Sequence, residues 1–377
     1  MAKAGLSTKE VISRADSQMK DVLDMLESFQ MPPYPSLSAE NARELPTPAD
    51  AVRGVVANHA GDRAKTFFTP IPEPVGSVTH RVIPGVIGDD ILLRIYTPKD
   101  AGSGPYPVLL YFHGGGWVIA DLDAYDASCR ALCNAVPCVV VSVAYHQAPE
   151  HKYPAAVKDA YAAYQWVLSN TATIHGDPNQ VAVAGESAGG NLATVVTLVA
   201  RDEGERLPVH QLLVYPVCDY AFDTPSYLEY ANAKPLSKAG MVWFYNNYLQ
   251  SPAQGNDPYA SPLRASLAGL PPATIIAAQL DPLNAEGRAY AERLQEAGVP
   301  VNYHNYDGVT HEFFGMKVVL DKAKDAQSIA ANDLKQAFAN QKLDQISPVQ
   351  FREAPKGTTP ITAEPVVREP DDQSPPL

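Results

Sequence analysis

One serine of this chain lies in the setting that a catalytic nucleophile requires. The apolar run 181–184 leads into the sequence Gly-x-Ser-x-Gly around Ser187, and a helix-like run follows at 191–199. A strand, this turn and a helix together hold the serine in a strained conformation, and the small flanking residues Gly185 and Gly189 permit the tight turn. The N-terminus of the helix favours developing negative charge on a group bound there. The alternative is an ordinary turn between a strand and a helix.

A second glycine-rich segment has the sequence HGGG at residues 113–116, directly after an apolar run. Consecutive glycines let the backbone approach a substrate and aim its N–H groups inward, which acyl transfer requires for the oxyanion of its tetrahedral intermediate. A phosphate-binding loop is the alternative, but the ending of a P-loop and the spacing of a dinucleotide fingerprint are both absent. The segment therefore favours acyl-transfer chemistry.

A serine hydroxyl is a poor nucleophile until a base removes its proton, so a histidine is expected on a loop beyond the sheet. The chain has nine histidines, and His311 follows the last predicted strand. His304 lies inside that strand, which favours a structural role for it. His113 precedes the glycines and is interpreted as bracing their loop. His311 is therefore the predicted base.

The acid that orients the base should end a neighbouring strand. Asp281 does so, because it directly follows the apolar run 274–280. Asp307 and Asp257 are the alternative acids, and neither follows a strand so directly. The chain order of serine, aspartate and histidine is the order found in α/β-hydrolases.

Metal catalysis finds no support in the sequence, since there is no His-Glu-x-x-His segment. Asp121, Asp123 and Asp126 resemble a calcium loop only loosely, because the glycine and the terminal glutamate of that loop are missing. We interpret them as the solvated start of a helix. Neither a metal nor a cofactor is expected.

The elements that must position these residues follow from the pattern of apolar runs. Strands at 78–83 and 91–96, joined by a turn at 88–90, predict a hairpin at a sheet edge. Further on, predicted strands (108–112, 138–143, 181–184, 209–217, 274–280, 301–306) alternate with predicted helices (124–135, 155–168, from 188, 285–297, 320–338). The alternation predicts an α/β fold with a mostly parallel sheet covered on both faces, whose ligand lies outside the carboxyl ends of the strands.

Two segments fall outside this alternation and are predicted to roof the site. One amphipathic helix is expected from Ser7 to Phe29, with a capping box of Ser7 and Glu10, and a second helix begins at Pro48 and fades at Gly61. A stretch rich in Tyr and Asn interrupts the strands between residues 219 and 262 and holds one helix-like run at 238–249. A packing appendage is the alternative to a roof.

The predicted organisation has three parts. Residues 1–75 form N-terminal cap helices, and residues 76–340 form the catalytic domain with a cap insertion at about 220–262. Residues 341–377 are polar and rich in proline, so we expect them to be disordered.

Composition narrows the classes of partner and compartment. The 377 residues are 46% hydrophobic and 19% charged, as in ordinary globular proteins, and the net charge is −13. This charge argues against nucleic acid or an anionic membrane as partner, and no apolar run approaches the ~20 residues of a membrane span. The N-terminus has no apolar core of a signal peptide, which predicts a cytoplasmic protein. The four cysteines form no Cys-x-x-Cys pair and are expected to be free, buried thiols.

With these motifs in order, the chain resembles the bacterial hormone-sensitive-lipase-like (family IV) carboxylesterases of the α/β-hydrolase fold over roughly residues 106–316. The segments 113–116 and 185–190 resemble the oxyanion and nucleophile motifs of that family. Residues 281–283 match the segment that carries the acid, and His311 with the two following residues matches the His-Gly-Phe around the base. Residues 145–154 resemble the Tyr-Arg-Leu-Ala-Pro-Glu stretch.

The resemblance implies a role for each matched residue. Ser187 is expected to be the nucleophile, Asp281 the acid and His311 the base. The amides of Gly114, Gly115 and Ala188 are expected to form the oxyanion hole. The resemblance also implies a cap made of the N-terminal helices and an insertion, and ester substrates with short acyl chains.

Three departures from the family pattern bear on pocket shape. His146-Gln147 stands where the family has Arg-Leu, and Asn284-Ala285 replaces a more acidic stretch. Glu186 stands before the nucleophile where aspartate is usual. None of them removes a residue of the expected triad.

The sequence therefore predicts a serine carboxylesterase that hydrolyses short-chain esters through an acyl-enzyme, acting on small molecules and with a homodimer left open. The first alternative is an amidase, a lactonase or a hydrolase of bulky xenobiotic esters or carbamates with the same triad. The second is a non-catalytic small-molecule binder, since the family includes a hormone receptor that has lost the histidine. A scaffold role for the Pro-rich tail is a third interpretation.

Overall fold

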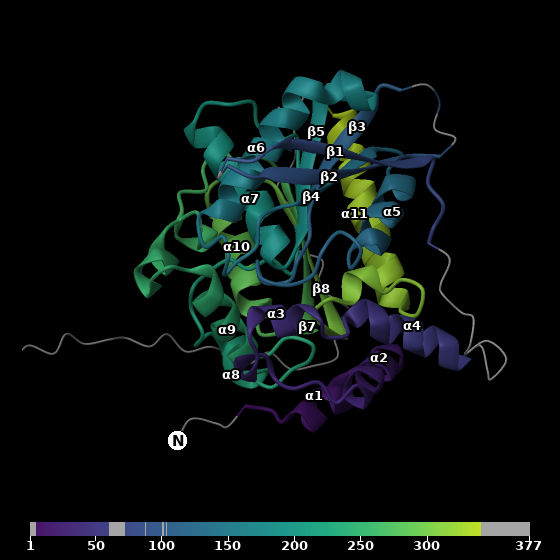
Figure 1. Ribbon diagram of the computed structural model, residues 1–377, viewed down its shortest axis with the longest axis vertical. Coiled ribbons are helices and arrows are strands. Elements are labelled where there is room, and N and C mark those ends of the chain that lie inside the picture. The colour runs from purple at the N-terminus through teal and green to yellow at the C-terminus, as the bar shows by residue number, and fades with distance from the viewer. Residues whose placement is uncertain (1–4, 60–71, 87, 100–101, 103, 341–377) are drawn as a thin grey trace, which may run out of the picture.

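An eight-stranded sheet forms the centre of the molecule (Figure 1). The computed structural model describes residues 5–59, 72–86, 88–99, 102 and 104–340. The strands are β1 (Ser77–Pro84), β2 (Asp90–Thr97), β3 (Tyr106–Phe112), β4 (Val139–Ala144), β5 (Gly176–Glu186), β6 (Gln211–Val214), β7 (Ala273–Leu280) and β8 (Val301–Thr310). Their order is β1-β2-β4-β3-β5-β6-β7-β8. The β1–β2 and β2–β4 pairs are antiparallel, and the other pairs are parallel. The mostly parallel sheet and the edge hairpin are confirmed.

Helices cover both faces of this sheet. On one face lie α6 (Ala155–Asn170), α7 (Ala188–Asp202) and α10 (Asn284–Glu296), and on the other lie α5 (Asp126–Ala135) and α11 (Asp321–Ala339) (Figure 1). Alternate residues of β3 enter opposite cores: Leu110 packs in the first and Leu109 in the second, and both are fully buried. Burial on both faces explains why the strands read as continuous apolar runs.

The strand register brings the segments after the strands to one edge of the sheet. Phe112 of β3 pairs with Gly185 of β5, Glu186 of β5 pairs with Val214 of β6, and Leu280 of β7 pairs with Thr310 of β8. Because these strands run in parallel, the residues that follow each of them emerge at the same carboxyl edge. This architecture is the α/β-hydrolase fold that the sequence predicts.

The N-terminal segment contains more helices than the sequence predicts. The single helix expected over 7–29 is wrong: α1 (Thr8–Arg14) ends early, and α2 (Ser17–Ser28) begins anew because the Asp16 side chain accepts a hydrogen bond from the amide of Met19. The capping box of Ser7 and Glu10 is confirmed. Two further helices follow, α3 (Ala39–Arg43) and α4 (Pro48–His59). The start of α4 at Pro48 is as predicted, and Gly61 lies outside the described residues.

The insertion between β6 and β7 contacts these N-terminal helices. It contains α8 (Pro225–Glu229), which the sequence did not indicate, and α9 (Lys238–Tyr248), which it did. The amide of Leu6 donates to the carbonyl of Glu229, and the Trp243 indole donates to the carbonyl of Leu37. The Tyr34 and Trp243 rings stack with centroids 5.4 Å apart. In Figure 1 all six of these helices gather at the carboxyl end of the sheet.

Short 3₁₀ helices complete the chain: η1 (Tyr34–Ser36), η2 (Thr171–Ile174), η3 (Pro252–Asn256), η4 (Pro262–Arg264) and η5 (Phe313–Gly315). The four cysteines are free and buried, as expected. Within the described residues, no helix has both the length and the apolar character needed to cross a membrane. The predicted disorder of 341–377 falls outside the described residues. The domain boundaries, the cytoplasmic location and the homodimer stay predictions.

Candidate active site

The backbone of Ser187 has the strained conformation that its sequence context predicts. Ser187 has φ of 59° and ψ of −120°, between the end of β5 and the first residue of α7. A Cβ at Gly185 would lie 2.1 Å from the carbonyl oxygen of Gly189, and a Cβ at Gly189 would lie 2.0 Å from that of Phe112. Both glycines are therefore required for this turn, which presents the serine side chain at the N-terminus of α7.

Three predicted residues meet in one hydrogen-bonded chain. The Ser187 Oγ lies 2.9 Å from Nε2 of His311, and Nδ1 of His311 lies 2.6 Å from Oδ2 of Asp281. Asp281 is fully buried, and its other oxygen accepts the amide of Leu283 at 2.9 Å. Burial by itself would lower the pKa of His311, but the carboxylates of Asp281, Glu312 and Glu186 together outweigh it and the pKa is raised above 6.5. This geometry lets the imidazole accept the serine proton.

The alternative acids and histidines lie elsewhere. Asp307 is exposed on β8, and Asp257 accepts the amide of Tyr259 in the insertion. His304 lies within β8. His113 is buried, with Nδ1 2.8 Å from the carbonyl oxygen of Gly114. The interpretation of His113 as a brace of the glycine loop therefore agrees with its contacts.

The conformation of the glycine loop after β3 requires glycine, and neighbouring side chains support the loop. Gly115 and Gly116 have φ of 96° and 59°, and a Cβ at Gly114 would lie 2.3 Å from the Tyr125 hydroxyl. At the end of the loop, the Gln147 amide donates to the carbonyl oxygens of Ile119 and Ala120 at 3.0 and 2.8 Å. Gln147, which stands where the family pattern has leucine, thus supports this loop directly.

The residues at the other departures from the family pattern also form hydrogen bonds with nearby groups. The His146 ring Nδ1 and backbone amide both lie within hydrogen-bond distance of Oδ2 of the buried Asp159, at 2.7 and 2.9 Å. Asn284 donates to the carbonyl of Ala278 and to the side chain of Asn305, both at 2.7 Å. These residues anchor the loops that follow β4 and β7 without entering the hydrogen-bonded chain of Ser187.

Glu186, beside the serine, is buried in a cluster of tyrosines. Its carboxyl accepts hydrogen bonds from the hydroxyls of Tyr111, at 2.5 Å, and Tyr215. Burial raises the pKa of Glu186 to about 7, and the negative charge of Glu312 adds to the shift. The longer carboxylate thus fills an internal position rather than reaching into solvent.

Glu312 is a site residue that the sequence reasoning missed. Its Oε1 accepts the Tyr125 hydroxyl at 2.7 Å and lies 3.7 Å from Nε2 of His311. The signal was available, because Glu312 occupies the glycine position of the expected His-Gly-Phe. Burial raises the pKa of Glu312, and the His311 charge opposes this.

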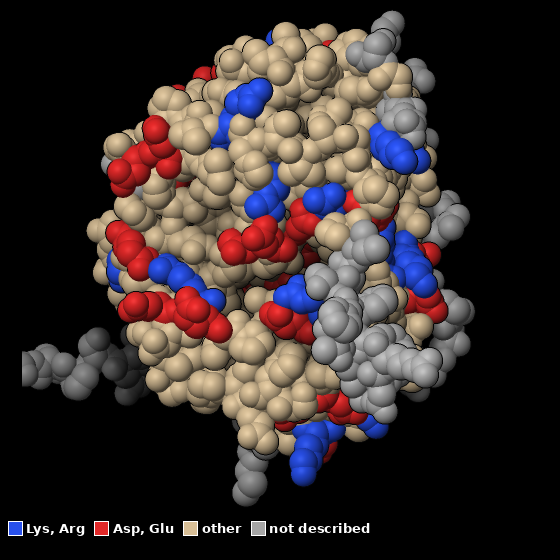
Figure 2. Space-filling view, turned by 45° about the vertical axis from the view of Figure 1, so that its right-hand side comes forward, with Lys and Arg blue, Asp and Glu red and all other residues tan. Residues whose placement is uncertain are grey.

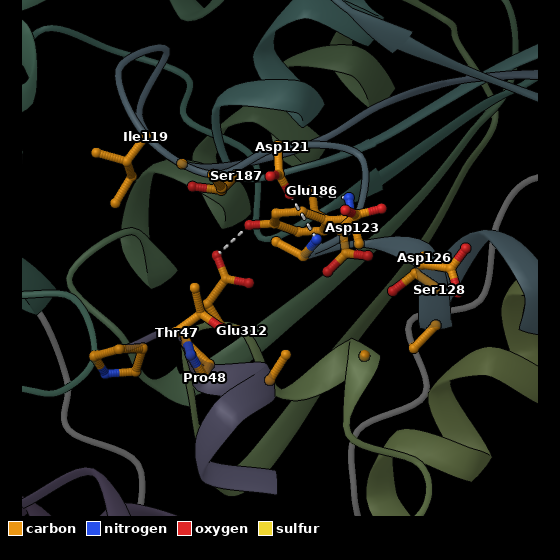
Figure 3. Close-up of a pocket in the computed structure, with 18 of the residues that line it drawn as sticks. Thr47, Pro48, Ile119, Asp121, Asp123, Asp126, Ser128, Glu186, Ser187 and Glu312 are labelled. Carbon is orange, nitrogen blue, oxygen red and sulfur yellow. Dashed lines mark hydrogen bonds between the residues drawn. The ribbon is translucent and has the colours of Figure 1, made fainter. Parts of the chain in front are cut away.

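A pocket of about 860 Å³ opens onto these residues (Figure 3). Ser187, Glu186, His311 and Glu312 lie on its wall together with residues of the glycine loop and of the helices α3, α4 and α9. This volume is in the range that small-molecule sites occupy, about 300–1,000 Å³. Figure 2 shows acidic and basic side chains gathered around a hollow on one face of the molecule.

The three aspartates that resemble a calcium loop only loosely bind protein groups. Asp121 caps the turn by accepting two backbone amides, Asp123 pairs with Arg94, and Asp126 pairs with Arg130. Among the residues that the structure describes, one group has the geometry to hold an ion: Asp89, His146 and His151. None of these three lines the pocket at Ser187.

Comparison with known proteins gives consistent matches. A family described as having the α/β-hydrolase fold matches residues 109–315. The carboxylic ester hydrolase LipN of Mycobacterium tuberculosis is 43% identical over 269 residues, which are 70% of this chain and 71% of LipN. The ethyl acetate hydrolase of Pseudomonas putida is 34% identical over 252 residues, 66% of this chain and 79% of that protein.

Solved structures agree with these relatives. A thermostable esterase from Pseudomonas putida has a TM-score of 0.77 at 34% identity, covering 86% of this chain and 98% of that one. A hyperthermophilic esterase from the archaeon Pyrobaculum calidifontis has a TM-score of 0.74 at 36% identity, covering 84% of this chain and 96% of that one.

Proposed function

Because this chain belongs to the hormone-sensitive-lipase-like carboxylesterases of the α/β-hydrolase fold, we propose that Ser187 is its nucleophile, His311 its base and Asp281 its orienting acid. The chain is a carboxylic ester hydrolase. The observation that carries the assignment is the continuous chain of hydrogen bonds from Ser187 through His311 to Asp281.

The reaction proceeds through an acyl-enzyme. His311 takes the proton of Ser187 as the serine oxygen attacks the ester carbonyl, and then gives that proton to the leaving alcohol. A water molecule repeats the sequence on the acyl-enzyme. Asp281 holds the imidazole in the tautomer that presents Nε2 to the serine and stabilises the imidazolium that forms.

The amides of Gly114, Gly115 and Ala188 form the oxyanion hole in this proposal. Supporting it, none of the three donates a hydrogen bond to another group that the structure describes. Ala188 is the first residue of α7, where the amide has no partner within the helix. Donors fixed in advance at the oxyanion are each worth on the order of 10²–10³ in rate.

Residues 1–75 and the insertion at about 220–262 form a cap in this proposal. The lining of the pocket supports it, because α3, α4 and α9 contribute residues to that lining and lie beyond the carboxyl end of the sheet (Figure 1). A pocket of about 860 Å³ suits small esters with short acyl chains. Amides, lactones and bulky esters remain the alternatives, and a substrate panel separates them.

Hydrolysis of p-nitrophenyl butyrate by the purified full chain and by Ser187→Ala tests the proposal. We expect the variant to lose at least about 10⁴-fold in kcat while its circular dichroism stays that of the parent. Equal rates would rule out the mechanism. Labelling of the parent, and not of the variant, by a fluorophosphonate probe checks the nucleophile independently of the substrate.

A further inference from the structure

Glu312 has a backbone conformation that side chains other than glycine adopt at a cost. Its φ is 72° and its ψ is 5°, in the left-handed region, which costs roughly 1–2 kcal/mol for a residue with a Cβ. A carboxylate is thus held, against backbone strain, directly beside His311, and strain of this kind gathers at functional sites.

The Glu312 carboxylate faces the substrate pocket. It lines the same pocket as Ser187 and His311, and its side chain is 17% exposed. Figure 3 shows it projecting into the space between its own segment and the residues around Ser187. A carboxylate offers about four acceptor positions, and the Tyr125 hydroxyl takes one of them. Acceptor positions therefore remain for a ligand.

The charge around the pocket is not balanced. Every lysine and arginine among the described lining residues is paired with a carboxylate: Arg43 with Glu150, Arg53 with Asp50, Arg94 with Asp123, Arg130 with Asp126 and Lys317 with Glu73. Glu44, Asp121 and Glu312 also line the pocket, and no lysine or arginine of the described chain pairs with them. Glu44 and Asp121 are exposed, whereas Glu312 is half-buried beside His311, so Glu312 is the one of the three whose charge is least screened by solvent.

Glu312 lies close enough to His311 to contact the alcohol part of a bound ester. His311 Nε2 must approach the leaving alcohol oxygen to about 3 Å to protonate it. Because Glu312 Oε1 lies 3.7 Å from Nε2, the alcohol oxygen comes within roughly 7 Å of the carboxylate. A nitrogen two carbons beyond that oxygen adds a reach of roughly 4 Å. Such a nitrogen can therefore contact Glu312 while the ester is in place.

We propose that Glu312 binds a cationic group on the alcohol part of the ester, so that the preferred substrates are esters of amino alcohols or of alcohols with a quaternary ammonium group. The inference rests on the proposed function of Ser187. In the acylation step the acyl carbon–oxygen bond breaks, the acyl–Ser187 bond forms, and the leaving oxygen takes the proton that His311 received. The ammonium group stays on the alcohol unchanged. Burial raises the pKa of Glu312, and a cation beside it favours the charged carboxylate.

A matched pair of esters tests this. 2-(Trimethylammonio)ethyl butyrate and 3,3-dimethylbutyl butyrate have the same acyl group and nearly the same shape, but only the first is charged. The readout is the ratio of their kcat/KM values for the full chain, for Glu312→Gln and for Glu312→Gly. Glu44→Gln serves as the control, since it removes a charge from another part of the pocket wall.

We expect the ratio of kcat/KM values for the parent to exceed that for Glu312→Gln at least tenfold. The ratio for Glu312→Gly should be as low as that for Glu312→Gln. Since the intrinsic reactivity of each ester is common to all variants, the change in ratio isolates Glu312. Glu44→Gln should keep at least half of the parent ratio. A parent ratio that both Glu312 variants preserve overturns the proposal. Failure of the proposed function gives a different result: neither ester is hydrolysed, and Ser187 is not labelled by a fluorophosphonate.

Discussion

Oε1 of Glu312 lies 3.7 Å from Nε2 of His311, the ring nitrogen that also contacts Ser187. The imidazole therefore has carboxylates near both of its nitrogens, with Asp281 at Nδ1. Both of these charges, and that of Glu186, favour protonated His311. The base of the proposed reaction is thus surrounded by groups that make it harder to deprotonate.

The first prediction concerns the acid limb of the pH profile. Only neutral His311 can accept the serine proton, so kcat/KM should fall as the pH drops through a His311 pKa that lies above 6.5. Glu312→Gln removes a charge that raises this pKa, and the limb should move to lower pH. The measurement is kcat/KM for an uncharged ester between about pH 5 and about pH 9. A limb that stays in place or moves upward in Glu312→Gln contradicts this account, and Glu44→Gln is the control.

The second prediction concerns the acid. Asp281→Asn should lower kcat by about 10⁴-fold, because the amide no longer fixes the tautomer that presents Nε2 to Ser187. Asp257→Asn, at the alternative acid, should change kcat less than about threefold, since Asp257 binds within the insertion. Both are measured with p-nitrophenyl butyrate at saturating concentration. A large loss in Asp257→Asn with little loss in Asp281→Asn would reverse the assignment.

The sequence predicted the sheet, and the meeting of three side chains at one of its edges, for a physical reason. Strands buried on both faces appear as continuous apolar runs, and the parallel sheet then forces Ser187, Asp281 and His311 to the same edge. Their convergence in the structure therefore follows from the strand order. The short turn after β5 carries its own signal, because it admits only small residues at 185 and 189.

Tertiary contacts decided the features that the sequence did not predict. The break between α1 and α2 depends on the Asp16 cap, which competes with an apolar periodicity that runs through it. The helix α8 has five residues, too few to show a period. Glu312 was not predicted as a site residue because the segment after His311 otherwise matches His-Gly-Phe, in which glycine stands at this position. Its contact with Tyr125 joins residues 187 positions apart in the chain.

The third prediction concerns Glu186 and stability. Its pKa is about 7 in the fold against 4.5 for a free side chain, so between these values the folded chain keeps a proton that the unfolded chain has lost. Stability should therefore fall as the pH rises through this window, by on the order of 3 kcal/mol. Glu186→Gln cannot ionise and should show a flatter dependence of the melting temperature on pH. Asp24→Asn, on the exposed side of α2, should keep the parent slope, and equal slopes in Glu186→Gln would refute the claim.

The fourth prediction compares two glycines of the catalytic domain. A Cβ at Gly189 would lie 2.0 Å from the carbonyl oxygen of Phe112, which is backbone and cannot rotate away, whereas the nearest atom to a Cβ at Gly287 is 3.9 Å distant. Gly189→Ala should lower the free energy of unfolding by at least about 2 kcal/mol. It should also displace Ser187 from His311 and so lower kcat.

Gly287→Ala places a methyl group in ordinary van der Waals contact with Pro216, within α10, and should stabilise the fold by up to about 1 kcal/mol. Urea unfolding followed by tryptophan fluorescence gives both free energies, and ester hydrolysis gives the effect on Ser187. The tight turn at Ser187 explains both results only if the two variants shift the free energy of unfolding in opposite directions. A Gly189→Ala protein with parental stability and parental kcat would mean that β3 and α7 can separate here without loss, and that the turn at Ser187 is not sterically determined.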